Sequence, residues 1–229
     1  MTAKHYIIKT TKVFAILAIL FFASCEDAFR KSKDEEGIIE FDTKGVDVNH
    51  PLYGFAPNSA TFKFKKKKFA IEMSVMGLFN MTILGDNTSK TMSQSVKFMN
   101  VKQACIENEK ELLKENLDYK IKIEETSETK DILGMKCYKI NVTMLDAPFS
   151  KFEAWYTKDL GMEDCNILTP YAQVKGMLLD YRLKKMGMEL HFAAKSYSHV
   201  EVPDQTFEIP ASMKIISKEE MAKFINDLQ

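Results

Sequence analysis

The sequence ETKDILGMKCYKINVTM at 128–144, followed by KFEAWYTKDL at 151–160, decides the fold. In each run apolar and polar side chains alternate, which is typical of a strand with one buried face. Pro148 lies in the connection between the two runs. Because proline cannot donate a hydrogen bond to a β-ladder, it fits a turn between two strands. The stretch therefore predicts a β-hairpin.

Segments with the same alternation continue on both sides of this hairpin, from Ile38 to about Val200. They are short, they number about ten, and turn signals such as Gly85-Asp86-Asn87 separate them. Many short strands with few helices indicate one large antiparallel sheet. We therefore expect a mainly β fold, in which a single curved, incompletely closed antiparallel sheet has a few short helices on its concave side.

Three segments depart from this alternation. Residues Cys105–Leu117 interleave apolar side chains with glutamate and lysine, which predicts a short amphipathic helix. Ser217 and Glu220 have the spacing of a capping box at the start of a second helix, Ser217–Leu228. Residues 161–176 lack a clear period, and we expect them to cross an open end of the sheet.

The charge balance argues against nucleic-acid binding. The chain has 229 residues with 32 Lys and Arg against 32 Asp and Glu, and the first 24 residues contain three lysines and no acid. The chain from Cys25 onward is therefore mildly acidic, at a net charge of −3, and offers no broad basic field to phosphate backbones. The four-lysine run 65–68 could be a phosphate patch, but such a run more often forms a solvated hairpin tip.

The first 25 residues predict the compartment. A basic start precedes an apolar run of 11 residues, Val13–Ala23, which is too short to span a bilayer, since a spanning helix needs about 20. The residues FASC at 22–25 then resemble a bacterial lipobox, with Phe22 in place of the commoner leucine. We expect residues 1–24 to be a lipoprotein signal peptide and Cys25 to be lipidated; the alternative is an ordinary secretory signal with a chance cysteine.

A charged segment, 25–36, separates this cysteine from the first predicted strand. It is poor in apolar residues, so we expect a flexible tether, followed by a single β-rich domain over 37–229. Glu26 rather than aspartate follows Cys25, so there is no evident signal for retention in the inner membrane. The prediction is a cell-envelope lipoprotein anchored in the outer membrane, on its periplasmic or its surface face.

Several motifs resemble a known group of bacterial proteins. The runs TSETKDILGMKCYK at 126–139, EAWYTKDL at 153–160, KGMLLDY at 175–181 and VPDQTFEIP at 202–210 are similar to those of an uncharacterised family of secreted bacterial domains. That family resembles the wider group of LolA/LolB-like lipoprotein carriers. The resemblance implies a curved, incompletely closed antiparallel sheet, with helices plugging its concave side and a cavity that holds acyl chains. It carries over no catalytic residue.

The residues themselves indicate no reaction. The chain has no G-x-S-x-G, H-E-x-x-H or C-x-x-C motif, so we expect no enzyme, no metal site and no cofactor. After lipidation of Cys25, three cysteines remain, which allow at most one intramolecular disulfide. Cys137 and Cys165 could meet in the fold. The equally plausible alternative is that these thiols, with Cys105, are free and buried.

The methionine content is unusual: the chain has 14 methionines, and 13 of them follow the expected signal peptide. Methionine adapts its shape, and cavities for flexible apolar ligands favour it. The candidate ligand site consists of methionines on inward strand faces, although such residues can also be plain core: Met73, Met81, Met144, Met177 and Met188.

Two functions follow as hypotheses. The first is a non-enzymatic envelope lipoprotein that binds or carries an acyl chain, a lipid or another apolar ligand on the concave face of the sheet. The second is a protein-interaction module of the outer membrane whose cavity is filled by its own side chains. A cavity open to solvent favours the first hypothesis, and a packed concavity beside an exposed apolar patch favours the second.

Overall fold

The computed structural model describes residues 36–117, 119–146, 150–185 and 188–227. Every described residue belongs to one compact unit, Asp34–Gln229. The expected signal peptide, Cys25 and nearly all of the tether, up to residue 35, lie outside the described residues, as does Pro148. The compact unit has its own hydrophobic core.

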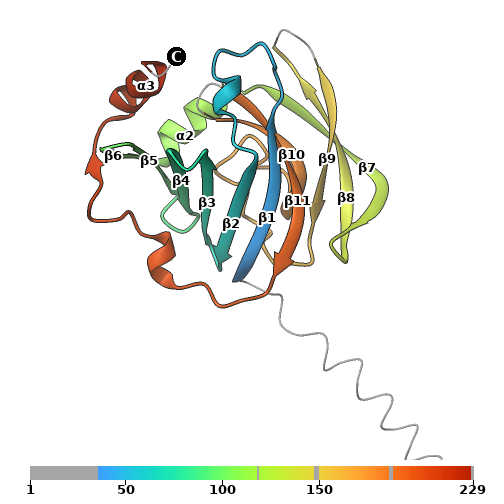
Figure 1. The fold of residues 1–229 in the computed structure, drawn as a ribbon. Helices are drawn as coiled ribbons and strands as arrows, with labels where there is room; N and C mark the ends of the chain where they lie inside the picture. Colours follow the sequence, from blue (N-terminus) through green and yellow to red (C-terminus); the bar gives the residue numbers. More distant parts are fainter. Residues whose placement is uncertain (1–35, 118, 147–149, 186–187, 228–229) are drawn as a thin grey trace, which may run out of the picture. The chain divides into compact units, whose positions relative to one another are not determined.

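This unit is built on one sheet of twelve strands in the described ranges, in the order β12-β6-β5-β4-β3-β2-β1-β11-β10-β9-β8-β7. Neighbouring strands are antiparallel, except that β12 runs parallel to β6. The sheet curves and its two ends do not close on each other, which confirms the predicted fold class (Figure 1). The strands are β1 (Glu36–Gly45), β2 (Ser59–Lys65), β3 (Lys68–Val75), β4 (Phe79–Asp86), β5 (Thr91–Phe98), β6 (Val101–Glu107), β7 (Ile121–Ile132), β8 (Met135–Met144), β9 (Lys151–Thr157), β10 (Met177–Lys185), β11 (Met188–Ser198) and β12 (Lys214–Ile215).

The predicted hairpin is β8 and β9. Ile140 pairs with Ala154, and both are fully buried, as alternation requires of inward positions. Trp155 faces the other side of the sheet beside Lys139, yet only 9% of it is exposed, because the ammonium of Lys130 lies 4.2 Å from its ring centroid. Trp155 is therefore buried although it lies on the outward face of the hairpin.

The structure has two strands more than the sequence analysis predicts, and one of them corrects the predicted helix Cys105–Leu117. The chain turns at Met99, whose φ is 50°, and returns as β6, so Cys105 lies in a strand. The helix α2 begins only at Glu109 and ends at Asn116. Its start is set by Asn108, whose side chain accepts hydrogen bonds from two backbone amides of the first turn. The second additional strand is the two-residue β12.

The remaining helices are short. The C-terminal helix α3 (Lys218–Asn226) begins with the predicted capping box of Ser217 and Glu220, which is confirmed. Two 3-10 turns, η1 (Tyr53–Phe55) and η2 (Asp204–Phe207), lie in connections. Residues 161–176 contain turns and no strand, as expected. No helix in the described ranges has both the length and the apolar character needed to cross a bilayer.

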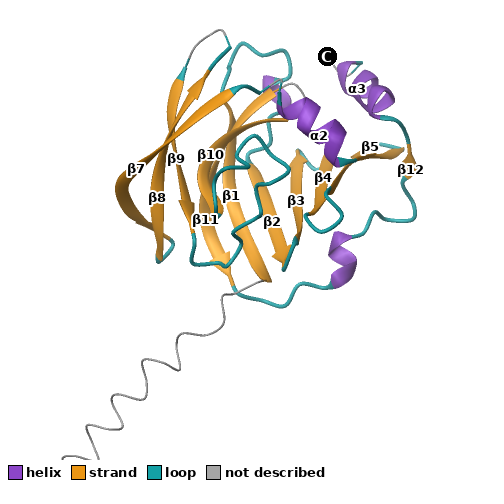
Figure 2. Cartoon of the chain, turned by 180° about the vertical axis from the view of Figure 1, so that it is seen from behind, coloured by secondary structure: helices purple, strands orange, loops and turns teal. Residues whose placement is uncertain are grey.

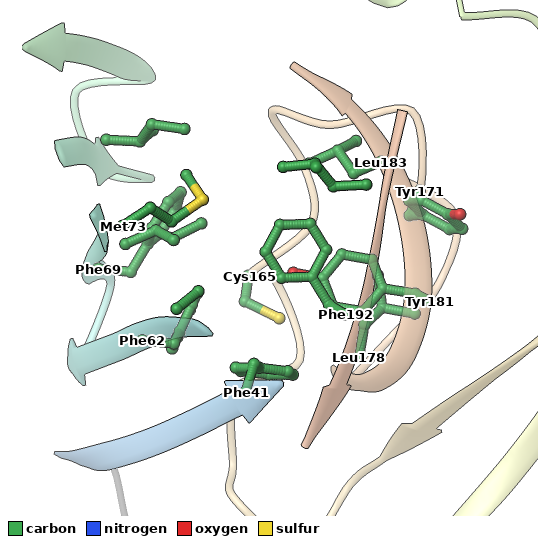
Figure 3. Packing of buried hydrophobic residues seen from close by; sticks show 14 of the residues in the cluster. Phe41, Phe62, Phe69, Met73, Cys165, Tyr171, Leu178, Tyr181, Leu183 and Phe192 are labelled. Atoms are coloured by element: carbon green, nitrogen blue, oxygen red, sulfur yellow. The ribbon is translucent and has the colours of Figure 1, made fainter. Parts of the chain in front are cut away.

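The core lies on the inward side of the curved sheet, where aromatic rings from distant strands meet. Tyr181 on β10 stacks on Phe192 on β11 with centroids 5.0 Å apart, and Phe41 on β1 meets both rings edge-on. Phe62 of β2 stacks on Phe69 of β3 at 5.5 Å. Figure 3 shows Phe62 and Phe69 on one side, Tyr181 and Phe192 on the other, and Phe41 between them. The site described next is lined by rings from both sides.

One line in the sheet is weakly paired. The ladder between β9 and β10 covers three positions and ends at Asp180↔Trp155, whereas β8 and β9 pair at seven positions. Beyond Asp180 the rest of β10 has no partner on β9 in this ladder. We call this line the β9/β10 seam. It joins the three strands β7, β8 and β9 to the rest of the sheet.

Candidate functional site: an apolar cavity on the inward face

A cavity of about 260 Å³ lies on the inward side of the sheet. Four strands, β2 to β5, form one wall, and β10 forms the other. The helix α2 and the segment 161–176 supply further lining residues, and both lie on the same side of the sheet (Figure 2). The lining is mainly aliphatic and aromatic: Phe62, Phe69, Ile71, Ile83, Met92, Glu115, Asn116, Tyr119, Cys165, Asn166, Leu168, Thr169, Pro170, Tyr171, Met177, Leu178, Tyr181, Leu183 and Lys184.

Alternation places the side chains of the first wall. Phe62, Phe69 and Ile71 occupy inward positions of β2 and β3, and all three are buried. The ring of Phe69 lies directly against the backbone of Gly85 on β4, where a Cβ atom would overlap it. Glycine at this position therefore lets the ring lie flat along the sheet. The result is a smooth apolar wall.

The segment 161–176 is held in place by its own polar side chains. Asn166 donates from Nδ2 to the carbonyl oxygens of Val174 and Gly176, at 2.9 Å and 2.7 Å. Tyr171, which is fully buried, donates its hydroxyl to the carbonyl of Arg182 on β10 at 2.6 Å. These buried bonds replace a regular ladder. They explain how a segment without alternation forms a fixed wall.

The tyrosine hydroxyls of the lining are also neutral. Tyr119 donates to Glu189 at 3.0 Å, and burial raises the pKa of Tyr119, Tyr171 and Tyr181 above the ordinary value. All three remain protonated in any physiological buffer. The deep part of the cavity therefore offers apolar contact and no charge.

Charged groups lie at the edge of the lining. The ammonium of Lys184 is exposed and forms no ion pair with any carboxylate in the described part of the chain. Glu115 is bound instead by Lys218 at 2.8 Å, and Lys218 also contacts the buried Glu107. Burial raises the pKa of Glu107, although its hydrogen bond with Lys218 opposes that shift. Lys184 is thus the one lining cation that is left for a ligand among these residues.

The five predicted methionines do not form one site. Met177 lines the cavity. Met73, Met81 and Met188 line a separate pocket of only about 40 Å³, together with residues of η1 and α3. Met144 is half-buried on β8 and lines neither space.

The other lining residues are ones that the sequence analysis did not select. Inward positions such as Phe62, Ile71 and Ile83 can be found by alternation, but alternation does not distinguish a side chain facing a cavity from one facing the core. The contribution of Asn116 and Asn166 had no sequence signal, because each acts through a hydrogen bond to a distant backbone carbonyl.

The three cysteines in the described residues are free and buried, which is the second of the two alternatives. Burial raises the pKa of the Cys137 thiol to about 11 and that of Cys165 to about 12, and it raises the pKa of Cys105 as well. Each thiol is therefore protonated and unreactive at neutral pH. Cys165 lies in the cavity wall and donates to the carbonyl of Gly176 at 3.3 Å.

The described residues contain no group of three or more His, Cys, Asp or Glu side chains placed to hold a metal ion. What the site offers is a neutral apolar space with a single free cation at its edge. Comparison with known proteins adds no assignment: no protein-family model matches the chain, and a search of curated proteins found no match.

Proposed function

We propose that the protein is a non-enzymatic lipoprotein of the bacterial cell envelope, which binds or carries one acyl chain on the inward face of its sheet. The observation that carries the proposal is the cavity of about 260 Å³ with its apolar lining. The proposal also rests on the lipobox-like residues at 22–25 and on the resemblance to lipoprotein carriers. The lipid on Cys25 would hold the unit at the outer membrane.

The size of the cavity sets the class of ligand. A water molecule occupies roughly 30 Å³ in the liquid, so the space holds about nine groups of that size. It lies just below the ~300–1,000 Å³ of typical small-molecule sites. One acyl chain, bound over part of its length, fits such a space, and the two chains of a phospholipid do not.

The charge at the edge sets the preferred head group. Lys184 is free to pair with an anion, while Glu115 is already bound to Lys218. A fatty-acid carboxylate at the edge would form a charge-assisted hydrogen bond with Lys184, and the chain would extend inward along Tyr181 and Leu183. We therefore expect a free fatty acid to bind more tightly than its methyl ester.

The test is the binding of a fluorescent fatty acid to the chain from Glu26 to Gln229, which contains the whole compact unit. We expect saturable binding at micromolar concentrations, and native mass spectrometry of the purified protein should detect bound fatty acid. Lys184→Gln should weaken the acid several-fold and leave its methyl ester unchanged. Lys175→Gln is the control, because Lys175 is a solvent-exposed lysine that is bound to Asp164 and lies outside the lining.

The opposite results would identify the alternative. If no acyl probe binds at micromolar concentrations, and no lipid accompanies the protein through purification, the cavity does not serve a lipid. The interaction-module hypothesis would then replace the carrier hypothesis. Binding that is equally strong in Lys184→Gln would retain the apolar site and exclude the proposed role of the lysine.

A further inference from the structure

A second hollow, of about 520 Å³, lies beside the end of β1 and next to β9, β10 and β11. It shares no lining residue with the apolar cavity. Its walls come from the end of β1, the connection that follows β1, the start of β9, and positions on β10 and β11. The lining consists of Lys44, Gly45, Val46, Val48, Tyr53, Lys151, Phe152, Glu153, Arg182 and His191.

The register of the sheet places three nitrogen-bearing side chains in one row. Lys44 on β1 is paired with His191 on β11, and His191 is paired with Arg182 on β10. Directly paired residues point to the same face, and neighbouring strands lie about 4.8 Å apart. The backbones of Lys44 and Arg182 are therefore roughly 10 Å apart, with the imidazole between them.

The β9/β10 seam forms the side of the hollow that lies toward β9. Because the ladder ends at Asp180↔Trp155, Arg182 has no partner on β9 in that ladder, and its guanidinium lies 4.7 Å from the ring centroid of Phe152. Stacking on an aromatic face fixes the plane of an arginine and leaves its N–H groups at the edge free to donate. Lys151 precedes Phe152 in the same wall. The opening in the sheet thus holds a fixed arginine between two lysines.

The protein balances the cations of this hollow only in part: the charge of Lys151 contributes to the lowered pKa of Glu124. No carboxylate in the described ranges forms an ion pair with Lys44, Lys151 or Arg182. The one acid of the lining, Glu153, is held by Lys139 at 2.6 Å. Asp180 is held by His191 at 2.8 Å and by Lys130 at 3.6 Å.

The carboxylate of Asp180 lies at the edge of this hollow, because it is bound to His191 of the lining. Burial alone would raise the pKa of Asp180, but the hydrogen bond from His191 and the charge of Lys130 keep it below the ordinary value, so Asp180 stays ionised on its own partners. Lys44, Lys151 and Arg182 form no ion pair in the described ranges, so this group of cations can attract an external anion.

The floor of the hollow is shaped for close contact. A Cβ atom on Gly45 would lie 2.9 Å from the ring of Tyr53, so the ring can pack directly on this backbone because residue 45 is glycine. Tyr53 and Phe152 then bound the basic row on two sides. The hollow is partly open to solvent, and its two lysines occupy exposed positions at its edge.

We propose that this hollow binds a phosphate group, with Arg182, Lys44 and Lys151 as its cationic ligands. A phosphate monoester carries up to two negative charges and three acceptor oxygens, which suits a planar guanidinium with lysines on both sides better than a single carboxylate does. The phosphate belongs either to a soluble compound or to a lipid head group. The proposal is independent of the acyl-chain site, because the two sites share no residue.

The test uses the chain from Glu26 to Gln229 with two probes. The first is inorganic phosphate, titrated against the thermal unfolding midpoint at constant ionic strength, with chloride as the comparison. The second is flotation with phosphatidylcholine vesicles that contain or lack phosphatidic acid. We expect a saturable rise of the midpoint with phosphate, or flotation that depends on phosphatidic acid. The first result identifies a soluble phosphate and the second a lipid head group.

Variants decide whether the hollow is responsible. Arg182→Gln and Lys44→Gln should each weaken binding about tenfold or more, since each loses a charge-assisted contact. Lys195→Gln is the control, because Lys195 is an exposed cation of β11 outside the lining. Arg182→Gln also loses its stacking on Phe152; Lys44 is exposed, so its variant should fold normally. Unchanged binding in Lys44→Gln, or no response to either probe, would overturn the proposal.

Discussion

Filling the apolar cavity is the most direct test of its existence. Ile83 on β4 is an inward, buried residue in the cavity lining. Ile140 on β8 is equally an inward, buried isoleucine, but it lines none of the three spaces described above. Replacing each by phenylalanine adds three carbon atoms at matched positions. In a closed core such an addition destabilises by about 1–3 kcal/mol, because neighbouring side chains must move.

The cavity reverses this expectation at Ile83. At Ile83 the added carbon atoms enter existing space, so the neighbouring side chains do not have to move. Each buried carbon that fills it returns about 0.8 kcal/mol, or about 2 kcal/mol for Ile83→Phe as an upper value. For a chain of this size, 1 kcal/mol moves the unfolding midpoint by about 2–4 °C. Ile83→Phe should therefore raise the midpoint of the ligand-free protein by a few degrees, and Ile140→Phe should lower it.

Calorimetry on the two delipidated variants measures the stability difference, and titration with a fluorescent fatty acid measures the functional one. Because the added ring occupies ligand space, Ile83→Phe should weaken the probe about tenfold, while Ile140→Phe binds it as the wild type does at a temperature where both are folded. The reasoning fails if the two variants are destabilised equally. It also fails if Ile83→Phe stabilises and the probe still binds unchanged.

Three further outcomes are expected. Labelled palmitate should be incorporated by the wild type and not by Cys25→Ser, and equal labelling would exclude lipidation at this residue. Trp155→Ala should lower the free energy of unfolding by roughly 3–5 kcal/mol, because only 9% of Trp155 is exposed. Denaturant titration measures this change, and a midpoint equal to that of the wild type would contradict a structural role for Trp155. Lys218→Ala should cost roughly 2 kcal/mol at pH 8, because buried Glu107 loses its cation. This loss should shrink toward pH 4, where the raised pKa of Glu107 keeps its carboxyl neutral in the folded state, and a pH-independent loss would disprove the pairing.

The fold class follows from the sequence because alternation is a local property. A side chain such as Ile140 must face inward once its strand forms, whatever its distant partners are. The capping box at Ser217 is local in the same sense, and it marks the start of α3 correctly. The spacing of Ile106, Leu113 and Leu117 predicts a helix that begins at Cys105, but all three side chains are exposed in the structure, and residues 105–107 belong to β6. The cap at Asn108 is the signal that separates the strand from the helix.

The candidate site could be predicted only in part, because a cavity depends on how distant segments pack against each other. Met177 and Met73 are both inward methionines, yet the first lines a space of about 260 Å³ and the second a space of about 40 Å³. The difference depends on the segment 161–176, which is held by Asn166 and Tyr171 through hydrogen bonds to backbone carbonyls. No period in the sequence encodes such bonds.

The three buried thiols make it possible to measure local opening of the structure at three separate places. Cys105 lies in β6, Cys137 in β8, and Cys165 in the segment that lines the cavity, so each belongs to a different part of the unit. A maleimide can modify such a thiol only while its surroundings are open, and the rate of modification then measures the frequency of that opening. Because β8 is joined to the rest of the sheet through the β9/β10 seam, Cys137 should be modified faster than Cys105. An acyl ligand should slow the modification of Cys165 first.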